Sequence, residues 1–307
     1  MVHRTIFEQQ HTQSPLSTAI NTMSTLHTFG CSITQGYALP DVINPIRNAQ
    51  GTPLTEAEIE AQGIQVDWNK IHLYQPSQFA WPQVLADRLG MNVINHARRG
   101  ACFQQIARQC TVGVGNIKPN DVIIVMWTYL QRLSLQWPAR TTVPFANQVD
   151  PNWGWRTVML GFNRLLGLEP AENTNEQSER HIQDYIERAT RETYLDPMGQ
   201  YNRYYNAMVL QCVTAGFLQN TGARVIHLSV ESEPCDQQLE HSRQELLKSL
   251  REPYVIPHPR DWYHISVDHH CVPIIFDPVI PLAENDMHPS VAHHRQFAEH
   301  LHRKYFS

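Results

Sequence analysis

The sequence predicts an α/β fold, a three-layer α/β/α sandwich around a mostly parallel central sheet. Two features of the chain favour this fold class. Segments with strand and helix patterns alternate along the sequence, which is typical of a parallel sheet covered by helices. After Asp121, the run 122–127 (VIIVMW) is continuously apolar, as expected of a central strand that is buried on both faces.

The chain has 307 residues, 42% of them hydrophobic, which is enough for a sizeable core. We expect one domain with insertions rather than two small domains. Residues 1–24 are polar and unpatterned and are interpreted as a mobile leader to a domain at 25–307. Three stretches lack clear periodicity and are interpreted as insertions, at about 38–76, 134–175 and 252–285.

The first half of the domain predicts three strands and two helices. Residues 25–29 alternate in polarity and are followed by Gly30, which indicates a strand. The helix expected at 81–89 has Pro82 in its first turn and Gly90 after its last residue. The remaining elements are a strand at 91–95, a helix at 103–110 and a strand at 121–127.

The second half adds a fourth strand and four helices, the first of which is expected from about residue 178. Residues 201–218 predict a long helix, and 224–230 (RVIHLSV) a strand. Another helix is expected after Asp236, and Ser290 is a good N-cap for a final helix. This order brings the carboxyl ends of the strands to one edge of the sheet, where α/β proteins collect their functional sites.

Composition excludes several classes of partner. The net charge is -5, from 24 basic and 29 acidic residues, and no long basic run suggests nucleic acid. No apolar run approaches a membrane span, and the first residues lack the apolar stretch of a signal peptide, so we expect a cytoplasmic protein. The six cysteines form no C-x-x-C pair and are expected to be buried free thiols. The oligomeric state stays open.

Segment 29–36 (FGCSITQG) directly follows the first strand, and its Ser32 is a candidate nucleophile. A serine in a tight turn at the end of a strand faces the crevice of the sheet, and Gly30 and Gly36 permit unusual backbone angles there. An amide at the following helix start can stabilise an oxyanion. The alternative is a serine that only caps that helix. Cys31 would be a strong nucleophile as a thiolate, but we expect it to be turned into the core.

Two further segments are expected at the same crevice. Segment 95–100 (NHARRG) follows the second strand, and Gly100 can present a bare backbone N–H. Segment 285–290 (NDMHPS) precedes the final helix, and its His288 can act as a general base if a carboxylate orients the ring. The plain alternatives are an ordinary strand-to-helix turn and a surface histidine at a helix entry.

Together these segments resemble the SGNH, or GDSL-like, hydrolase family. Segment 29–36 is similar to its first block, F-G-D-S-x-T-x-G, with Cys31 where the acid usually stands. Segment 95–100 is similar to the second block and 286–290 to the last, in the family's order. The resemblance covers roughly 25–36, 78–132, 202–230 and 285–304.

This resemblance implies a flavodoxin-like SGNH fold and a serine esterase that works through an acyl-enzyme. It implies Ser32 as nucleophile, His288 as its base, and the Ser32 and Gly100 amides as oxyanion donors. No cofactor or metal ion is implied. The expected substrate is an ester of a small molecule or a carbohydrate; three tryptophans within 134–156 favour a sugar, although they can equally pack that segment.

The first departure from the family concerns its third block, whose Asn donates to the oxyanion. Here the third strand runs into 127–132 (WTYLQR), which contains no Asn. Losing one such donor typically lowers turnover ~10²–10³-fold. Thr128, Tyr129, Gln131 and Arg132 are the candidate replacements, with Thr128 as our first choice and Arg132 as the second. Arg132 and Trp127 are also candidates for substrate binding.

The second departure concerns the acid. The family has Asp three residues before the histidine, where this chain has Asn285. Asp286 stands two residues before His288 and points to the same side of an extended turn, so we expect Asp286 to orient the ring. Asn285 remains the alternative.

Three other functions stay open. Acyl transfer shares the acyl-enzyme with hydrolysis. A non-catalytic binding module on a decayed hydrolase core is favoured by the missing Asn. A metal site would use His264, His269 and His270 with Asp261 or Asp268, although their spacing matches no known ligand motif. We expect most of the 17 histidines to lie at the surface.

Overall fold

The computed structural model describes most of the predicted domain. The residues it describes are 23–43, 76–130, 132–136, 155–159, 164–166, 184, 188, 192, 196–231, 235–250, 265–283 and 288–307. The expected leader, apart from its last two residues, and large parts of the three expected insertions lie outside these ranges.

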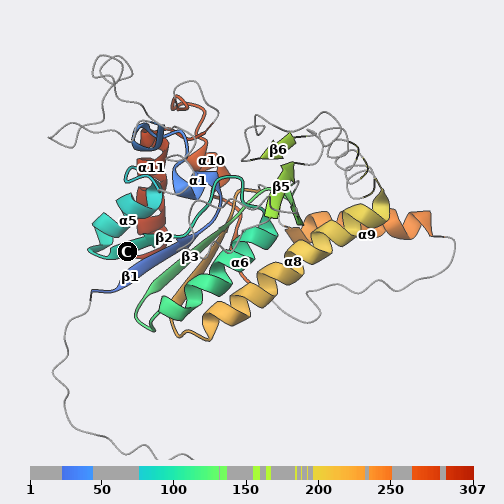
Figure 1. The fold of residues 1–307 in the computed structure, drawn as a ribbon, viewed down its shortest axis with the longest axis horizontal. Coiled ribbons are helices and arrows are strands. Elements are labelled where there is room, and N and C mark those ends of the chain that lie inside the picture. The colour runs from blue at the N-terminus through green and yellow to red at the C-terminus, as the bar shows by residue number, and fades with distance from the viewer. Residues whose placement is uncertain are drawn as a thin grey trace, which may run out of the picture.

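A five-stranded sheet forms the centre of the molecule, and all of its neighbouring strands are parallel (Figure 1). The strand order is β2-β1-β3-β7-β8. The strands are β1 (Thr25–Phe29), β2 (Asn92–Asn95), β3 (Val122–Trp127), β7 (Arg224–Ser229) and β8 (Val267–Asp268). The predicted fold class is confirmed.

Helices cover both faces of this sheet (Figure 1). Helices α5 (Trp81–Leu89) and α11 (Val291–Tyr305) pack together on one face. Helices α6 (Phe103–Gly113) and α8 (Pro197–Gln219) lie on the other, and α9 (Cys235–Ser249) packs on α8. The short elements are α1 (Ser32–Gln35), α2 (Pro40–Ile43), the 3-10 turn Val114–Asn116 and α10 (Val272–Ile275).

Apolar side chains from both helical layers meet the sheet in a continuous core. Every residue of β3 is buried, as its apolar sequence predicts. On one face, Trp81 of α5 meets Phe297 of α11 edge to face, with ring centroids 5.6 Å apart. Helix α5 begins and ends at the predicted residues, and its last turn is closed by Gly90 in the left-handed region. None of the described helices is both long and apolar enough to cross a membrane.

The connection of the strands places a crevice beside β1. The chain passes from β1 to β2 on one side and then crosses to β3 on the other, so the strand order reverses between β1 and β3. In open α/β sheets, ligands bind outside the carboxyl ends of the strands at this switch point. Phe29, the last residue of β1, pairs with Val125, so β3 extends two residues beyond β1 at this edge.

A second, antiparallel sheet contradicts the irregular structure expected for residues 134–175. It consists of β4 (Arg132–Gln136), β5 (Trp155–Met159) and β6 (Arg164–Leu166). The alternation of polar and apolar residues in RLSLQ is the period of a strand, so the sequence does contain the signal. Strand β8 was also not anticipated within 252–285, because two residues are too short to show any period.

Candidate active site

The turn after β1 holds Ser32 at the crevice. Cys31 adopts an extended conformation as the N-cap of α1, and Ser32 is the first residue of that helix. Gly36 ends the helix with φ of +79°, and its N–H donates to the Ser32 carbonyl over 2.9 Å. A Cβ atom on Gly36 would lie 2.7 Å from the side chains of Ala80 and Ser77. The glycine is therefore required both by its backbone angle and by close packing.

Ser32 and His288 lie within hydrogen-bond distance, as expected from the sequence. The Oγ atom of Ser32 is 3.0 Å from Nε2 of His288, across 256 residues of chain. Ser32 is 2% exposed, whereas His288 is partly exposed. Asp286 and Asn285, the two candidates for orienting His288, lie outside the described residues.

The segment that carries His288 is fixed at the entry to α11. The His288 carbonyl accepts a hydrogen bond from the Ala283 N–H over 3.0 Å. Two residues later, Ser290 caps α11 in a reciprocal arrangement with His293, and the other ring nitrogen of His293 lies 3.0 Å from the Asp277 carbonyl. These contacts hold the backbone on both sides of the imidazole.

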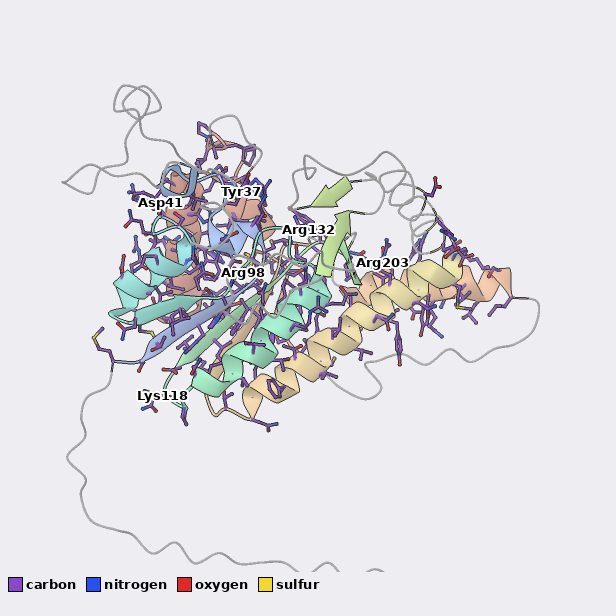
Figure 2. All side chains as sticks on the ribbon, in the orientation of Figure 1. Tyr37, Asp41, Arg98, Lys118, Arg132 and Arg203 are labelled. Carbon is purple, nitrogen blue, oxygen red and sulfur yellow. The ribbon has the colours of Figure 1, made fainter. Side chains whose placement is uncertain are left out.

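Tyr37 contacts His288, and Arg99 contacts Tyr37; neither residue was anticipated from the sequence. The Tyr37 ring meets the His288 ring at 70°, with centroids 5.1 Å apart. The Arg99 guanidinium lies 4.0 Å from the centroid of the Tyr37 ring. Tyr37 stands between two left-handed residues, Gly36 and Ala38, and Ala38 has φ of +68°. Figure 2 shows Tyr37, Arg98 and Arg132 at the end of the sheet where α1 lies.

The loop between β2 and α6 is tied to the Ser32 turn at two points. The Asn95 side chain donates to the Thr34 carbonyl over 2.8 Å and accepts from the Ala97 N–H over 3.1 Å. The Arg98 N–H donates to the Gly30 carbonyl over 3.1 Å. Gly100 follows with φ of +72° and is buried. The loop thus brings Gly100 to the same edge of the sheet as Ser32.

Thr128 and Arg132 lie where β3 leads into β4. Arg132 Nη1 donates to Thr128 Oγ1 over 2.9 Å and to the Ala101 carbonyl over 3.2 Å. Thr128 is fully buried. The Glu231 carboxylate accepts from the Leu130 N–H over 2.8 Å, which anchors this connection to the end of β7. Residue 131 lies outside the described part of the chain.

The structure places Trp127 in the core. Its side chain is 0% exposed, its ring stacks on Phe103 with centroids 5.2 Å apart, and Nε1 donates to Nδ1 of His227 over 3.2 Å. This burial argues against the substrate contact that we expected for Trp127. Beside it, burial raises the pKa of the Tyr129 phenol to about 12, with Cys31 adding to the effect, so the phenol stays protonated at neutral pH.

Five cysteines whose side chains the structure describes are buried and form no disulfide bond. They are Cys31, Cys102, Cys110, Cys212 and Cys271. Burial raises the pKa of the Cys271 thiol to about 12 and that of the Cys110 thiol still further, which disfavours the reactive thiolate at neutral pH. Cys31 is fully buried, as expected.

The residues of the metal-site alternative make other contacts. Asp268 accepts from Lys304 Nζ and from the Tyr305 hydroxyl, each over 2.7 Å, and the His269 ring lies 3.2 Å from the Glu231 carbonyl. His264 and Asp261 fall outside the described ranges. Within those ranges, no three His, Cys, Asp or Glu side chains are grouped so that they could hold a metal ion.

Four of the histidines that the structure describes are buried, among them His294, which the sequence places on the inner face of the final helix. The four are His27, His227, His293 and His294. Each has one ring nitrogen within hydrogen-bond distance of another polar atom.

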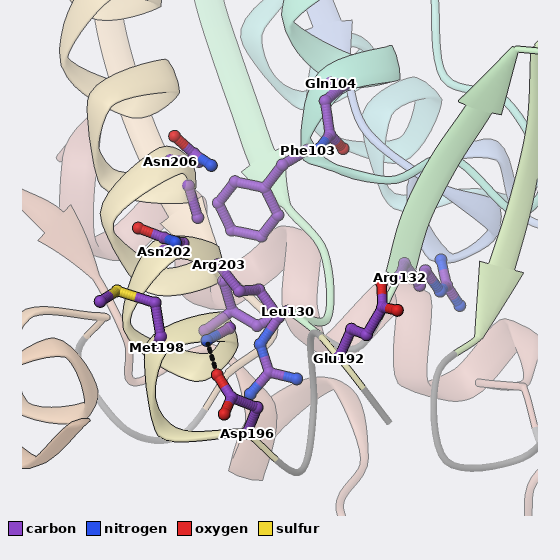
Figure 3. A pocket seen from close by; sticks show the side chains of 12 residues that line it. Phe103, Gln104, Leu130, Arg132, Glu192, Asp196, Met198, Asn202, Arg203 and Asn206 are labelled. Atoms are coloured by element: carbon purple, nitrogen blue, oxygen red, sulfur yellow. Dashed lines mark hydrogen bonds between the residues drawn. The ribbon is translucent and has the colours of Figure 1, made fainter. Parts of the chain in front are cut away.

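A cavity of about 290 Å³ adjoins Arg132 (Figure 3). It lies between the start of α6, the β3–β4 connection and the first turns of α8. Its apolar wall includes the buried side chains of Phe103 and Leu130. The polar and charged residues that line it are Gln104, Arg132, Glu192, Asp196, Asn202, Arg203 and Asn206.

No protein-family model matches the chain, and no curated protein sequence matches it. Two solved structures are similar to it at 11% sequence identity and a TM-score of 0.38. One is a carbohydrate esterase described as having an active site with divergent catalytic and non-catalytic binding functions; the similarity covers 94% of this chain and 68% of that one. The other is an acetyl xylan esterase from the rumen bacterium Butyrivibrio proteoclasticus, with 95% and 66% covered.

Proposed function

We propose that the protein is a serine ester hydrolase of the SGNH type, with Ser32 as nucleophile and His288 as its base. The observation that carries this proposal is the 3.0 Å separation of Ser32 Oγ and His288 Nε2. The pair lies beyond the carboxyl end of β1, at the switch point of a parallel sheet. A hydroxyl and an imidazole in this geometry are the minimum that acyl transfer through a serine needs.

The reaction proceeds through an acyl-enzyme. His288 Nε2 takes the Ser32 proton while Oγ bonds to the ester carbonyl carbon, and the carbonyl oxygen becomes an oxyanion. The intermediate collapses as the C–O bond to the alcohol breaks, and His288 returns the proton to the departing alkoxide. Water then attacks the acyl group with His288 again as base, which releases the carboxylic acid and restores Ser32. We assign the orientation of His288 to Asp286.

The oxyanion is held by the amides of Ser32 and Gly100 and by the hydroxyl of Thr128. The support for Thr128 is its contact with Arg132, whose Nη1 donates to the threonine oxygen over 2.9 Å. A hydroxyl that accepts from a guanidinium turns its own proton elsewhere, and the positive charge makes that proton a better donor. Thr128 would then replace the Asn of the family's third block.

The substrate is an ester of a polar alcohol, with a carbohydrate as the best fit. The cavity beside Arg132 supports this choice because it combines an apolar wall, Phe103 and Leu130, with side-chain amides that both donate and accept hydrogen bonds. A sugar ring has apolar faces and hydroxyls that need both kinds of partner. A long acyl chain would leave the polar lining without partners.

The test compares Ser32→Ala with Cys31→Ala in the hydrolysis of 4-nitrophenyl acetate. Ser32→Ala is expected to reduce turnover to the background rate, whereas Cys31→Ala, which changes the adjacent buried side chain, is expected to retain most of it. Far-UV circular dichroism checks that both variants fold. Loss of turnover in a folded Cys31→Ala variant, with activity kept in Ser32→Ala, would reverse the assignment.

A further inference from the structure

We infer that Arg132 is a positioning residue that holds the Gly100 loop in the geometry required for hydrolysis. It acts by bonding at once to the Ala101 carbonyl and to the Thr128 hydroxyl. The inference rests on the proposed function, because it assigns to Arg132 the arrangement of the oxyanion donors. Its test is therefore designed so that the two can fail separately.

Arg132 contacts the loop on the far side of Gly100, where the Ala101 N–H also donates to the Arg98 carbonyl over 3.2 Å. The two ties to the Ser32 turn, from the Asn95 side chain and the Arg98 N–H, lie on the N-terminal side of Gly100. Gly100 itself sits in the left-handed region, and glycine is the residue with the greatest backbone freedom. The contact from Arg132 to the Ala101 carbonyl fixes the chain one residue beyond Gly100. The amide of Gly100 is thereby held between two fixed points.

Arg132 is itself rigidly mounted. The Arg132 N–H donates to the Tyr129 carbonyl over 3.2 Å, and the Glu231 carboxylate anchors Leu130 within the same turn. The guanidinium lies 5.2 Å from the centroid of the Tyr129 ring. Both hydrogens of Nη1 are used, one toward Thr128 and one toward Ala101, across 31 residues of chain. A planar guanidinium supports this double contact better than the flexible point charge of a lysine.

The cavity makes the role of Arg132 testable by chemical rescue. Because Arg132 lines a cavity of about 290 Å³, truncating its side chain leaves a space that a guanidinium ion can enter. We expect Arg132→Ala to lower kcat for 4-nitrophenyl acetate by about 10²-fold, the typical cost of a misplacement of about 1 Å, with little change in KM. Guanidinium chloride below denaturing concentrations should restore part of kcat, and methylammonium chloride should not. Arg132→Lys should fall between the wild type and Arg132→Ala.

Arg224 provides a matched control at the other end of the sheet. Its guanidinium also donates to a backbone carbonyl, that of Tyr305, over 2.6 Å, and also lies over an aromatic ring, 5.0 Å from the Phe306 centroid. Arg224→Ala should leave kcat and KM unchanged and show no dependence on guanidinium. This control separates a general loss of activity, caused by removing any arginine, from the specific effect of removing Arg132.

The outcomes separate the two proposals. If the wild type and Arg224→Ala hydrolyse no ester, the proposed function fails. If both are active, the inference is overturned by an unchanged kcat in Arg132→Ala or by a rise in KM alone. It is also overturned if a folded Arg132→Ala variant has a lower kcat that guanidinium does not restore. Should Arg132→Ala fail to fold, Arg132→Lys decides: a lower kcat at constant KM supports the inference, and a wild-type kcat overturns it.

Discussion

Two buried histidines should make the stability of the protein fall in mild acid. His227 is 6% exposed and His294 is 0% exposed. In each, Nδ1 accepts a hydrogen bond from a tryptophan N–H: Nε1 of Trp127 over 3.2 Å and the backbone N–H of Trp81 over 3.1 Å. Burial lowers the pKa of His227 to about 4 and that of His294 to about 3, the latter with help from its neighbouring histidines.

The sign and size of the effect follow from linkage. In the unfolded chain each histidine has a pKa near 6.5, so below that pH the unfolded state binds protons that the folded state rejects. The two histidines leave the free energy of unfolding at its full value above about pH 6.5. They lower it progressively as the pH falls from about 6.5 toward the pKa of each folded histidine. At pH 5, which is about 1.5 units below 6.5, each histidine costs about 2 kcal/mol, at about 1.4 kcal/mol per unit. Together they should remove about 4 kcal/mol, a large part of a typical stability of about 5–15 kcal/mol.

The assay is urea unfolding at pH 7 and pH 5, followed by tryptophan fluorescence. The His227→Asn/His294→Asn double variant keeps an acceptor near each Nδ1 position but cannot be protonated. Because asparagine is smaller than histidine, the variants are compared by the change in their free energy of unfolding between pH 7 and pH 5, and not by its absolute value. Between pH 7 and pH 5, the free energy of unfolding of the wild type should fall by about 4 kcal/mol more than that of the double variant. His241→Asn, a control at an exposed site, should behave as the wild type. Equal losses in the wild type and the double variant would refute the reasoning.

Two further predictions concern backbone angle and a buried carboxylate. Gly36→Ala should lower the free energy of unfolding by about 2–4 kcal/mol, because φ is +79° and the new Cβ would lie 2.7 Å from two neighbouring Cβ atoms. Gly90→Ala is the control, since Gly90 has φ of +62° and open space around it. In the same urea titration, Gly90→Ala should lower the free energy of unfolding by only about 1–2 kcal/mol. Burial opposes the charge of Asp268, but hydrogen bonds from Lys304 and Tyr305 hold its pKa at about 2. Asp268→Asn should therefore cost about 1–2 kcal/mol at pH 7, and this difference should shrink as the pH falls from about 4 toward about 2; a constant difference would contradict the ionic role.

The fold follows from signals that are local in the sequence. The apolar run of β3 and the proline and glycine that bound α5 determine these elements without help from distant residues. Strand β8 has no such signal, because its place at the sheet edge comes from pairing with β7. The alternation in β4 was present and was outweighed by the irregular residues around it. Local periodicity predicts long elements well, whereas short strands depend on tertiary pairing.

The candidate site likewise contains residues that the sequence predicts and contacts that it does not predict. Ser32, Gly100 and His288 each stand beside a strand end or a helix start, so sequence position alone brings them to one edge of the sheet. The contact of Arg99 with Tyr37 joins two loops, and that of Arg132 with Ala101 joins two others. Such contacts depend on how loops meet after folding. Composition alone does not report which histidines are buried; His294 is one whose position on the inner face of the final helix does predict burial.

The central claim is that Ser32 is the nucleophile and that His288 activates it. The most direct measurement is peptide mass spectrometry after reaction with a fluorophosphonate, which forms a P–O bond to an activated serine and releases fluoride. The account predicts one adduct on Ser32 in the wild type, formed far more slowly in His288→Gln and absent in Ser32→Ala. An adduct on Cys31 or Tyr129 with Ser32 unmodified, or labelling of Ser32 at the same rate in His288→Gln, would contradict it.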